Sequence, residues 1–311
     1  MTAQEKSGHD PVAVGLVGCG RWGRNILRDL LSLRCRVVVV EPNPENRQLA
    51  ATLGPAEIVN DISRLPPVEG IIAATPATTH AAVVEALLDR GVPIFCEKPL
   101  TTDPASAARL VNRASDRLFV MHIWRYHCGI QELAEIARSQ QLGPVLALRT
   151  ERTNWTSPRQ DTDSIWTLVP HDLTIALAIL GKIPAPRSAA VEIIADKPVS
   201  ITAMLGDTPW FSLNSSTRYR EKHREVRLHC EDGVAVLPSA ESRYIEILRS
   251  TATPDRTPLI ERRPISGESA LIRELTVFVQ YLRGGPPPPT DAHEGLAVVN
   301  AVAALRRLAE I

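Results

Sequence analysis

The chain has 311 residues, with 35 Lys and Arg side chains against 35 Asp and Glu, so its formal net charge is zero. This balance excludes the strong positive field of a protein that binds nucleic acid or an anionic membrane surface. Hydrophobic residues make up 44% and charged residues 23%, which is typical of a folded chain and not of a disordered one. Because the length exceeds what one hydrophobic core usually serves, we expect two domains.

The sequence also predicts a compartment. No run reaches 18 apolar residues, so we expect no membrane-spanning helix, and the polar N-terminus lacks the apolar segment of a secretory signal. Five cysteines are widely spread without a Cys-x-x-Cys pair, so the sequence predicts neither a disulfide framework nor a bound metal. We therefore expect a cytoplasmic protein.

Strands and helices alternate over the first part of the chain. An apolar strand at 12–17 runs into a glycine-rich turn, and strands and helices then follow in turn. The further elements that we predict are helices at 24–33, 44–53, 80–90 and 103–114 and strands at 36–40, 58–59, 70–74, 92–96 and 118–122. This alternation is typical of a doubly wound parallel sheet, so we predict a dinucleotide-binding Rossmann domain over residues 1–122.

The pattern changes after residue 122. Short strand-like runs separated by Gly, Pro and Asp turns indicate an antiparallel or mixed sheet, and a polar stretch spans 151–163. The predicted elements are helices at 129–139, 166–180, 269–283 and 291–310 and strands at 145–150, 188–195, 199–204, 210–216, 225–230, 234–237 and 244–248. We predict a second, substrate-binding and oligomerisation domain over residues 123–311.

The glycine-rich turn carries the first functional pattern. Gly18, Gly20 and Gly23 follow a strand and open a helix, and Glu41 ends the next strand. In this context glycines allow a tight turn and a close approach to a pyrophosphate, which the helix N-terminus attracts. Glu41 can accept hydrogen bonds from ribose hydroxyls and would repel a 2′-phosphate, which favours NAD over NADP. The alternative is a glycine turn that binds nothing. The cofactor-binding residues that we predict at this turn also include Cys19, Arg21 and Trp22.

Two further segments lie at the carboxyl ends of predicted strands, where open parallel sheets bind ligands. Glu97, Lys98 and Pro99 follow the strand at 92–96. A lysine there can donate a hydrogen bond to a substrate oxygen, or exchange a proton if burial lowers its pKa. On spacing alone, however, a solvated lysine paired with Glu97 is the favoured interpretation. Thr75 and Pro76 end the preceding strand and by themselves indicate only a turn.

His171 lies near the start of an apolar helix. A lone histidine in such a place is more often a structural core residue, although the adjacent Asp172 and the helix N-terminal location favour a site. The charged run at 218–227 is interpreted as a solvated strand face or rim.

Taken together and in this order, these segments resemble the Gfo/Idh/MocA oxidoreductase family. The most specific match is Cys96-Glu97-Lys98-Pro99-Leu100, and the matches extend over nearly the whole chain. The other matching segments are residues 14–23, Ala74-Thr75-Pro76 with His80, Arg125-Tyr126-His127, residues 142–145, Pro170-His171-Asp172-Leu173 and residues 291–296.

The resemblance implies more than the spacing does. It implies an α/β protein in which the second domain is built on a large open, mostly antiparallel sheet that joins subunits into a homodimer or homotetramer. It places the nicotinamide beside Lys98, and makes Lys98 and His171 the catalytic residues. A cis peptide before Pro99 is expected. The further residues that the resemblance makes cofactor-binding are Thr75, Pro76, His80, Glu97, Lys98 and Pro99.

One position departs from the family's pattern. Many members carry an acid four residues before the histidine, whereas this chain has Thr167 there. Threonine cannot hold a charge near neutral pH, so His171 is expected to be less basic than in those members. This change leaves open which group is the catalytic base. It also leaves open the alternative that the chain is a non-catalytic, NAD(H)-binding regulatory protein.

The predicted activity is hydride transfer between NAD and a secondary alcohol or ketone of a sugar. The segment at 18–25 most resembles the branch of the family that acts on nucleotide-activated sugars. A free polyol or inositol dehydrogenase and the reduction of an imine are the alternatives. The residues predicted to contact substrate are Arg125, Tyr126, Asn154, Trp155, Arg159, Trp166, Thr167 and His171.

Overall fold

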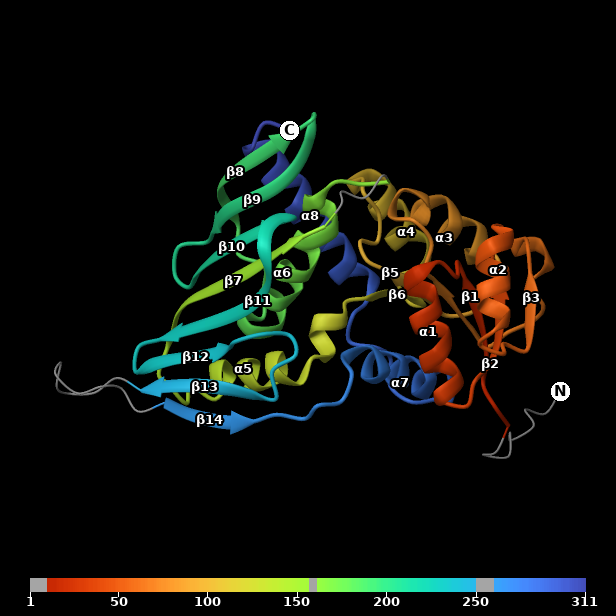
Figure 1. Ribbon diagram of the computed structural model, residues 1–311, viewed down its shortest axis with the longest axis horizontal. Helices are drawn as coiled ribbons and strands as arrows, with labels where there is room; N and C mark the ends of the chain where they lie inside the picture. Colours follow the sequence, from red (N-terminus) through yellow and green to blue (C-terminus); the bar gives the residue numbers. More distant parts are fainter. Residues whose placement is uncertain (1–9, 157–160, 250–259) are drawn as a thin grey trace.

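The computed structural model describes residues 10–156, 161–249 and 260–311. The strands form two separate sheets, one of six strands and one of eight (Figure 1). Within the described ranges, no helix combines the length and the apolar character needed to cross a membrane.

The first sheet is parallel throughout. Its elements are β1 (Ala13–Val17), α1 (Arg21–Ser32), β2 (Arg36–Val40), α2 (Pro44–Ala51), β3 (Glu57–Val59), β4 (Gly70–Ala73), α3 (His80–Leu88), β5 (Ile94–Glu97), α4 (Pro104–Ala114) and β6 (Leu118–Met121), with 3₁₀ helices at Ile62–Arg64 and Ala77–Thr79. The strand order β3-β2-β1-β4-β5-β6 reverses direction between β1 and β4, which is where such sheets bind ligands. Helices on both faces bury the strands, so short Val- and Ile-rich runs suffice. The predicted Rossmann fold is confirmed.

The second sheet is mostly antiparallel, as expected. The elements of this half are a 3₁₀ helix at Ile123–Tyr126, α5 (Cys128–Arg138), β7 (Val145–Trp155), α6 (Ser164–Leu180), β8 (Pro186–Ile194), β9 (Lys197–Leu205), β10 (Trp210–Ser216), β11 (Arg218–Cys230), β12 (Gly233–Leu237), β13 (Tyr244–Arg249), β14 (Ile260–Pro264), α7 (Ala270–Leu282) and α8 (Ala292–Leu308). The strand order is β14-β13-β12-β11-β7-β10-β9-β8, and only the β10–β7 pair is parallel.

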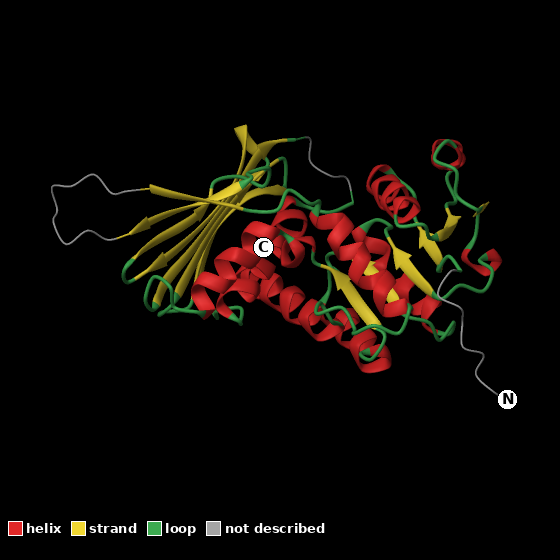
Figure 2. Ribbon diagram, turned by 90° about the horizontal axis from the view of Figure 1, so that it is seen from below, coloured by secondary structure: helices red, strands yellow, loops and turns green. Residues whose placement is uncertain are grey.

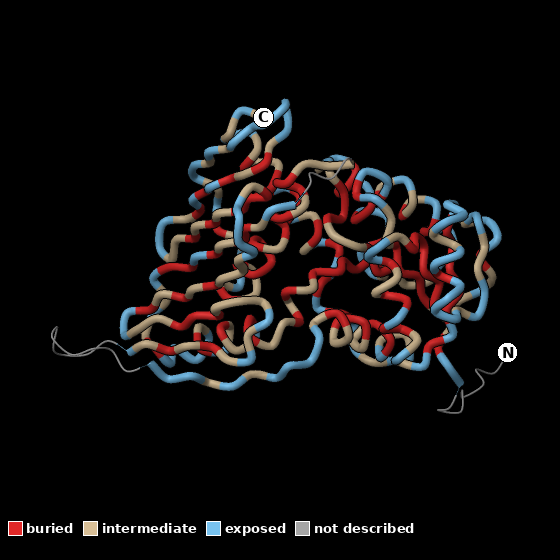
Figure 3. The backbone as a smooth tube through the Cα atoms, in the orientation of Figure 1, coloured by how far each residue is buried: buried red, intermediate tan, exposed pale blue. Residues whose placement is uncertain are grey.

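Helices α5, α6 and α8 cover one face of this sheet, and among the described residues no helix covers the other face (Figure 2). Buried residues accordingly concentrate between the two sheets and along the helix-covered face (Figure 3). Asp163 caps α6 by accepting hydrogen bonds from the backbone N–H groups of Ile165 and Trp166, and Arg306 of α8 pairs with it 2.5 Å away. The start of α6 is therefore fixed in position beside the first sheet.

Helix α7 comes late in the sequence but packs on the first sheet. The ring of Phe278 lies 5.0 Å from that of Phe95, and the ring of Tyr281 lies 5.2 Å from that of Phe119. One face of the first sheet is thus covered in part by α7, a helix from beyond residue 122. The division of the chain into domains at residue 122 stays a prediction.

Three strands differ from the sequence-based expectation. β7 continues to Trp155 through part of the predicted polar stretch, β11 begins at Arg218 rather than near 225, and β14 was not predicted. The backbones of the charged stretches of β7 and β11 pair with one another along an antiparallel ladder. In the run predicted as a solvated strand face, residues 219–222 are exposed, whereas Arg224 is half-buried and Val226 is buried.

Candidate active site

A cavity of about 930 Å³ opens at the carboxyl ends of the parallel strands. Loops after β1, β2, β4 and β5 form one side, and α6, β7 and β11 form the other. The residues that line it are Gly18, Gly20, Arg21, Trp22, Gly23, Glu41, Pro42, Asn46, Ala74, Thr75, Pro76, Ala77, Glu97, Lys98, Pro99, Met121, Ile123, Trp124, Arg152, Thr162, Trp166, Thr167, His171, Lys222, Arg224 and Ala240. Most of the predicted cofactor residues therefore share one cavity with Trp166, Thr167 and His171.

The glycine loop fits a dinucleotide. Gly18 has φ +92°, and a Cβ there would lie 2.6 Å from the main-chain oxygen of Ala74. A Cβ on Gly23 would lie 2.3 Å from the main-chain oxygen of Gly18, whereas one on Gly20 would meet nothing within 4 Å. The first and third glycines thus allow tight packing, and the second leaves the backbone open toward the cavity. With the N-terminus of α1 at this point, the loop suits a pyrophosphate.

Glu41 fits the adenosine ribose of the same ligand. Its side chain is buried at the end of β2 but lines the cavity. One carboxylate oxygen accepts a hydrogen bond from the backbone N–H of Cys19 at 2.7 Å, and the other accepts from that of Asn43 at 2.9 Å. Both oxygens keep a further lone pair for ribose hydroxyls. The Cys19 side chain points away into the core, and burial raises its pKa to about 11, so only its backbone belongs to the site.

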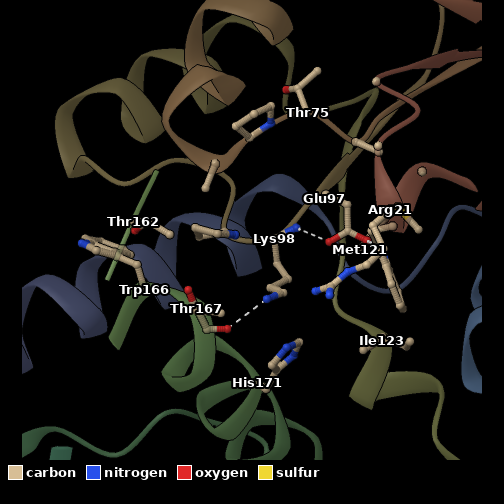
Figure 4. A pocket seen from close by; sticks show the side chains of 18 of the residues that line it. Arg21, Thr75, Glu97, Lys98, Met121, Ile123, Thr162, Trp166, Thr167 and His171 are labelled. Atoms are coloured by element: carbon tan, nitrogen blue, oxygen red, sulfur yellow. Dashed lines mark hydrogen bonds between the residues drawn. The ribbon is translucent and has the colours of Figure 1, made fainter. Parts of the chain in front are cut away.

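Lys98 reaches from the first sheet to helix α6. Its Nζ donates a hydrogen bond to the main-chain oxygen of Thr167 at 2.9 Å, and its backbone N–H donates to Glu97 at 3.0 Å (Figure 4). The indole N–H of Trp22 donates to the other oxygen of Glu97. The peptide before Pro99 is cis, as expected. These contacts hold the ammonium group of Lys98 inside the cavity.

His80 supports this loop from behind. Its two ring nitrogens lie 2.7 Å from the main-chain oxygen of Pro99 and 3.0 Å from that of Thr75. The side chain is buried and does not line the cavity. The structure therefore places His80 as a brace between two strand-end loops rather than as a residue that faces the cofactor.

His171 lies on α6 with its ring near Lys98 (Figure 4). Burial first, and then the positive charges of Lys98 and Arg152, hold its pKa well below 6.5, so the imidazole is neutral at pH 7. Thr167 donates its hydroxyl to the main-chain oxygen of Asp163 at 2.8 Å and brings no negative charge. The expected low basicity of His171 agrees with this environment.

The adjacent Asp172 has a structural role instead. It is fully buried, accepts a hydrogen bond from Arg152 at 3.0 Å, and accepts another from the hydroxyl of Ser215 at 2.7 Å. These contacts tie α6 to the sheet beneath it and so fix the position of His171.

Several predicted substrate residues lie outside the cavity. Arg125 pairs with Glu294 of α8 at 3.4 Å, and the buried Tyr126 lies 3.2 Å from the hydroxyl of Thr290. Both contact the chain that leads into α8 and are not among the residues that line the cavity. Asn154 lines a smaller cavity of about 220 Å³ that shares Arg21 and Thr167 with the main one. Trp155 is 65% exposed with Arg218 over its ring at 5.1 Å, and Arg159 lies outside the described residues.

Three cationic residues of the cavity were missed. Arg152 belongs to β7, and Lys222 and Arg224 belong to β11. Arg152 lies in the predicted polar stretch at 151–163. Lys222 and Arg224 lie in the charged run at 218–227, which was predicted to be a solvated strand face or rim. Strand alternation places Lys222 and Arg224 on one face, and this was the available signal. Their distance from α6 depends on strand pairing, which the sequence does not reveal.

Comparison with known proteins agrees with the fold and with an NAD-binding first domain. A family model described as "Oxidoreductase family, NAD-binding Rossmann fold" matches residues 12–122. The UDP-N-acetylglucosamine 3-dehydrogenase of Acidithiobacillus ferrooxidans is 28% identical over 94% of this chain and 95% of that protein. An inositol 2-dehydrogenase of Pseudomonas fluorescens is 28% identical over 93% of this chain and 91% of that protein.

Solved structures agree as well. The structure of the Acidithiobacillus ferrooxidans UDP-N-acetylglucosamine 3-dehydrogenase has a TM-score of 0.82 with 26% identity, covering 97% of this chain and 98% of that one. Levoglucosan dehydrogenase in complex with NADH and levoglucosan has a TM-score of 0.86 with 17% identity, over 97% and 98% of the two chains, and shows the fold alone.

The fold, the glycine loop and Glu41 define an NAD-binding oxidoreductase. The segment Glu97-Lys98-Pro99 and the matches above then narrow this class of oxidoreductase to one family. Over residues 12–122 the chain belongs to the Gfo/Idh/MocA oxidoreductase family, and the similarity to the relatives above extends over nearly the whole chain.

Proposed function

We propose that this protein transfers hydride between NAD and a secondary alcohol or ketone carbon of a nucleotide-activated sugar. The observation that carries the proposal is the convergence of Lys98 and His171 in the cavity that also contains the glycine loop. An ammonium group and a neutral imidazole are then available on one side of a reacting carbon–oxygen bond. When bound, NAD supplies the hydride acceptor, nicotinamide C4.

Lys98 is the residue that we assign to the substrate oxygen. Its Nζ is already aimed at a main-chain oxygen, that of Thr167, so a substrate oxygen beside it can accept a second hydrogen bond. In alcohol oxidation Lys98 acts as the neutral amine and takes the hydroxyl proton while the hydride on the same carbon leaves for NAD. In ketone reduction it donates the proton that turns the oxygen into a hydroxyl.

His171 completes the site as a neutral group. Because its pKa lies well below 6.5, it accepts a hydrogen bond from the substrate hydroxyl at neutral pH and does not compete with Lys98 as a cation. We therefore assign His171 to orienting the substrate oxygen, and Lys98 to carrying the proton. The Thr167 hydroxyl is held by the main chain of Asp163 and brings no negative charge to His171.

The choice of a nucleotide-activated sugar rests on the glycine-loop segment and on the UDP-N-acetylglucosamine 3-dehydrogenase that matches nearly the whole chain. Inositol 2-dehydrogenases match to a similar extent, so a free polyol is the second candidate. We also propose a cytoplasmic enzyme, because free thiols such as Cys128 persist in a reducing compartment.

The test is the Lys98→Met variant, assayed by nicotinamide absorbance against nucleotide-sugars, free sugars and inositols. We expect kcat to fall about 10²- to 10⁴-fold, which is the usual loss on removing a general acid or base. Lys182→Met, at an exposed site after α6, is the matched control and should keep full activity. NAD binding measured by calorimetry should remain unchanged in both variants.

Two outcomes contradict the proposal. Undiminished turnover in Lys98→Met would remove the role assigned to Lys98. NAD binding by the unmodified protein without turnover on any member of the panel would favour a regulatory protein over an enzyme.

A further inference from the structure

The cavity is strongly polarised in charge, although the chain as a whole is neutral. Among the described residues that line it are five Lys or Arg side chains but only two carboxylates, Glu41 and Glu97, and both carboxylates belong to the Rossmann half. Arg21 lies beside the glycine loop, where the cofactor's pyrophosphate is expected. Three cations, Arg152, Lys222 and Arg224, lie on the strands of the other half.

Arg152 and Arg224 are directly opposite one another. They are paired residues in the antiparallel ladder between β7 and β11, so their side chains leave the sheet on the same face. Like charges in this arrangement destabilise a sheet. The repulsion is evident in Arg224, because burial first and then the charge of Arg152 lower its pKa to about 10. An anion bound beside the two arginines would offset the repulsion between them.

Among the described residues, only one of the two arginines forms an ion pair with a carboxylate. Arg152 pairs with the buried Asp172 at 3.0 Å and lies over the ring of Trp124 at 4.5 Å. Arg224 donates through Nη1 to the main-chain oxygens of Thr153 and His223, both at 2.6 Å. The charges of Asp172 and Glu241 act on Arg224 only from a greater distance, because each carboxylate pairs with another cation.

Lys222 extends the same feature toward the rim. It lies two residues before Arg224 on β11, hence on the same face of the strand about 7 Å away. Its ammonium is exposed and pairs with the exposed Glu241, so it can exchange that partner for a ligand at little cost. Because Arg224 lies deeper in the cavity and Lys222 lies at its rim, the two cations suit an elongated oxyanion that contacts both.

We propose that Arg224 and Lys222 form an anion subsite that binds a phosphoryl or carboxylate group of the substrate. The inference deepens the proposed function and rests on it: the sugar that enters this cavity is acidic, either through the diphosphate of a nucleotide or through a carboxylate on its own ring. Arg224 is the determinant of that specificity. A neutral polyol leaves the guanidinium without a counter-ion.

The experiment measures equilibrium binding to the NAD-saturated full chain, so that the cofactor's own phosphate site is filled. The probes are UDP, inorganic pyrophosphate, glucuronate and the neutral N-acetylglucosamine, titrated by calorimetry. We expect Arg224→Gln to weaken binding of the anionic probes about tenfold to a hundredfold, as the loss of a charged hydrogen bond does. Binding of the neutral sugar should not change, and raising the salt concentration should weaken only the anionic probes.

Matched variants separate binding from folding. Arg220→Gln makes the same charge change on the same strand at an exposed residue outside the cavity, and should bind all probes normally. Arg224→Lys keeps the charge and should recover most of the affinity. Because Arg224→Gln removes one of two opposed cations, its melting temperature should equal or exceed that of the unmodified protein.

The outcomes distinguish the sources of the anion and the two proposals. UDP and pyrophosphate binding that depends on Arg224 assigns the subsite to a nucleotide diphosphate, and glucuronate binding that depends on it assigns the subsite to a sugar acid. Anion affinity that is equal in Arg224→Gln and the unmodified protein, or absent in both, overturns the subsite even if Lys98-dependent turnover is found. Arg224-dependent binding without turnover on any sugar keeps the subsite and overturns the proposed hydride transfer.

Discussion

Thr167 stands where the family resemblance implies an acid. Its main-chain oxygen accepts a hydrogen bond from the ammonium of Lys98, and its hydroxyl donates to the main-chain oxygen of Asp163. Residue 167 therefore adds no negative charge beside His171. Burial first, and then the charge of Lys98, hold the pKa of His171 well below 6.5.

Replacing Thr167 by Asp tests this account at the residue scale. A carboxylate beside Lys98 and His171 favours the imidazolium, so the pKa of His171 should rise. Since our mechanism needs a neutral His171, the acid limb of kcat/KM should move to higher pH. The measurement is the pH profile, together with the imidazole titration followed by NMR.

Thr167→Asn is the control, because it has the same shape as Asp without the charge. It should leave the acid limb where it is in the unmodified protein. If the Asp and Asn variants give superimposable profiles, the charge at residue 167 does not govern His171.

At this scale, sequence reasoning succeeded where a short segment contains its own context. Lys98 follows a strand inside a specific segment, and Glu41 ends the strand after the glycine loop, and both line the cavity as predicted. Arg224 was not predicted to line it, because its place there depends on the pairing of β11 with β7. His80 was predicted as a cofactor residue but is buried outside the cavity lining, a difference that a single sequence does not reveal.

At the scale of elements, α7 brings a carboxyl group into the core. Glu274 is completely buried, and neither of its oxygens has a hydrogen-bond partner among the described residues. Burial first, and then the charge of Glu97, raise its pKa well above 4.5. The folded protein consequently keeps a proton on Glu274 at pH values where the unfolded chain has lost it.

This difference predicts how stability depends on pH. A group whose pKa is higher in the folded state makes stability fall as pH rises above the unfolded value, here 4.5. Glu274→Gln cannot ionise, so between about pH 5 and pH 8 the melting temperature of the unmodified protein should fall relative to the variant. A relative change of several degrees is on the order expected for a chain of this size.

The measurement is thermal unfolding followed by circular dichroism across this pH range. Glu268→Gln, at an exposed residue just before α7, serves as the control and should track the unmodified protein. Parallel melting curves for all three proteins would show that Glu274 does not ionise differently on folding.

The boundaries of helices and strands were predicted well only where the sequence carries a hydrophobic pattern. The helices and the parallel strands were predicted closely because their apolar runs are buried on both faces or repeat with helical spacing. The charged halves of β7 and β11 carry no such pattern and exist as strands because they pair with one another. Strand β14 is a mostly exposed edge strand and offers no apolar repeat.

At the scale of the whole molecule, the eight-stranded sheet leaves one face without helices (Figure 2). On β9, the buried Ala203 and Leu205 alternate with Met204, which is 38% exposed and so points away from the helices. Trp210 on the neighbouring strand lies on this same outer side, where Arg149 covers its ring at 4.8 Å. A broad sheet face of this kind suits association with a second copy.

We therefore expect a homodimer or homotetramer in sedimentation equilibrium. Met204→Glu places a charge on the outer face, next to the edge strand β8, and should shift the protein toward the monomer. Leu49→Glu, at an exposed position on α2, is the matched control and should not change the mass. A monomeric unmodified protein would contradict this assembly.

The return of α7 to the first sheet has a consequence for protein synthesis. Its Phe278 and Leu275 belong to the same apolar cluster as Phe95 and Leu16, which are translated far earlier. A nascent chain that has emerged only as far as residue 122 contains every strand of the first sheet, yet one face still lacks its cover. That face stays exposed to solvent, or is bound by chaperones, until residues 270–282 leave the ribosome. The first half of the chain to be made is thus one of the last to complete its fold.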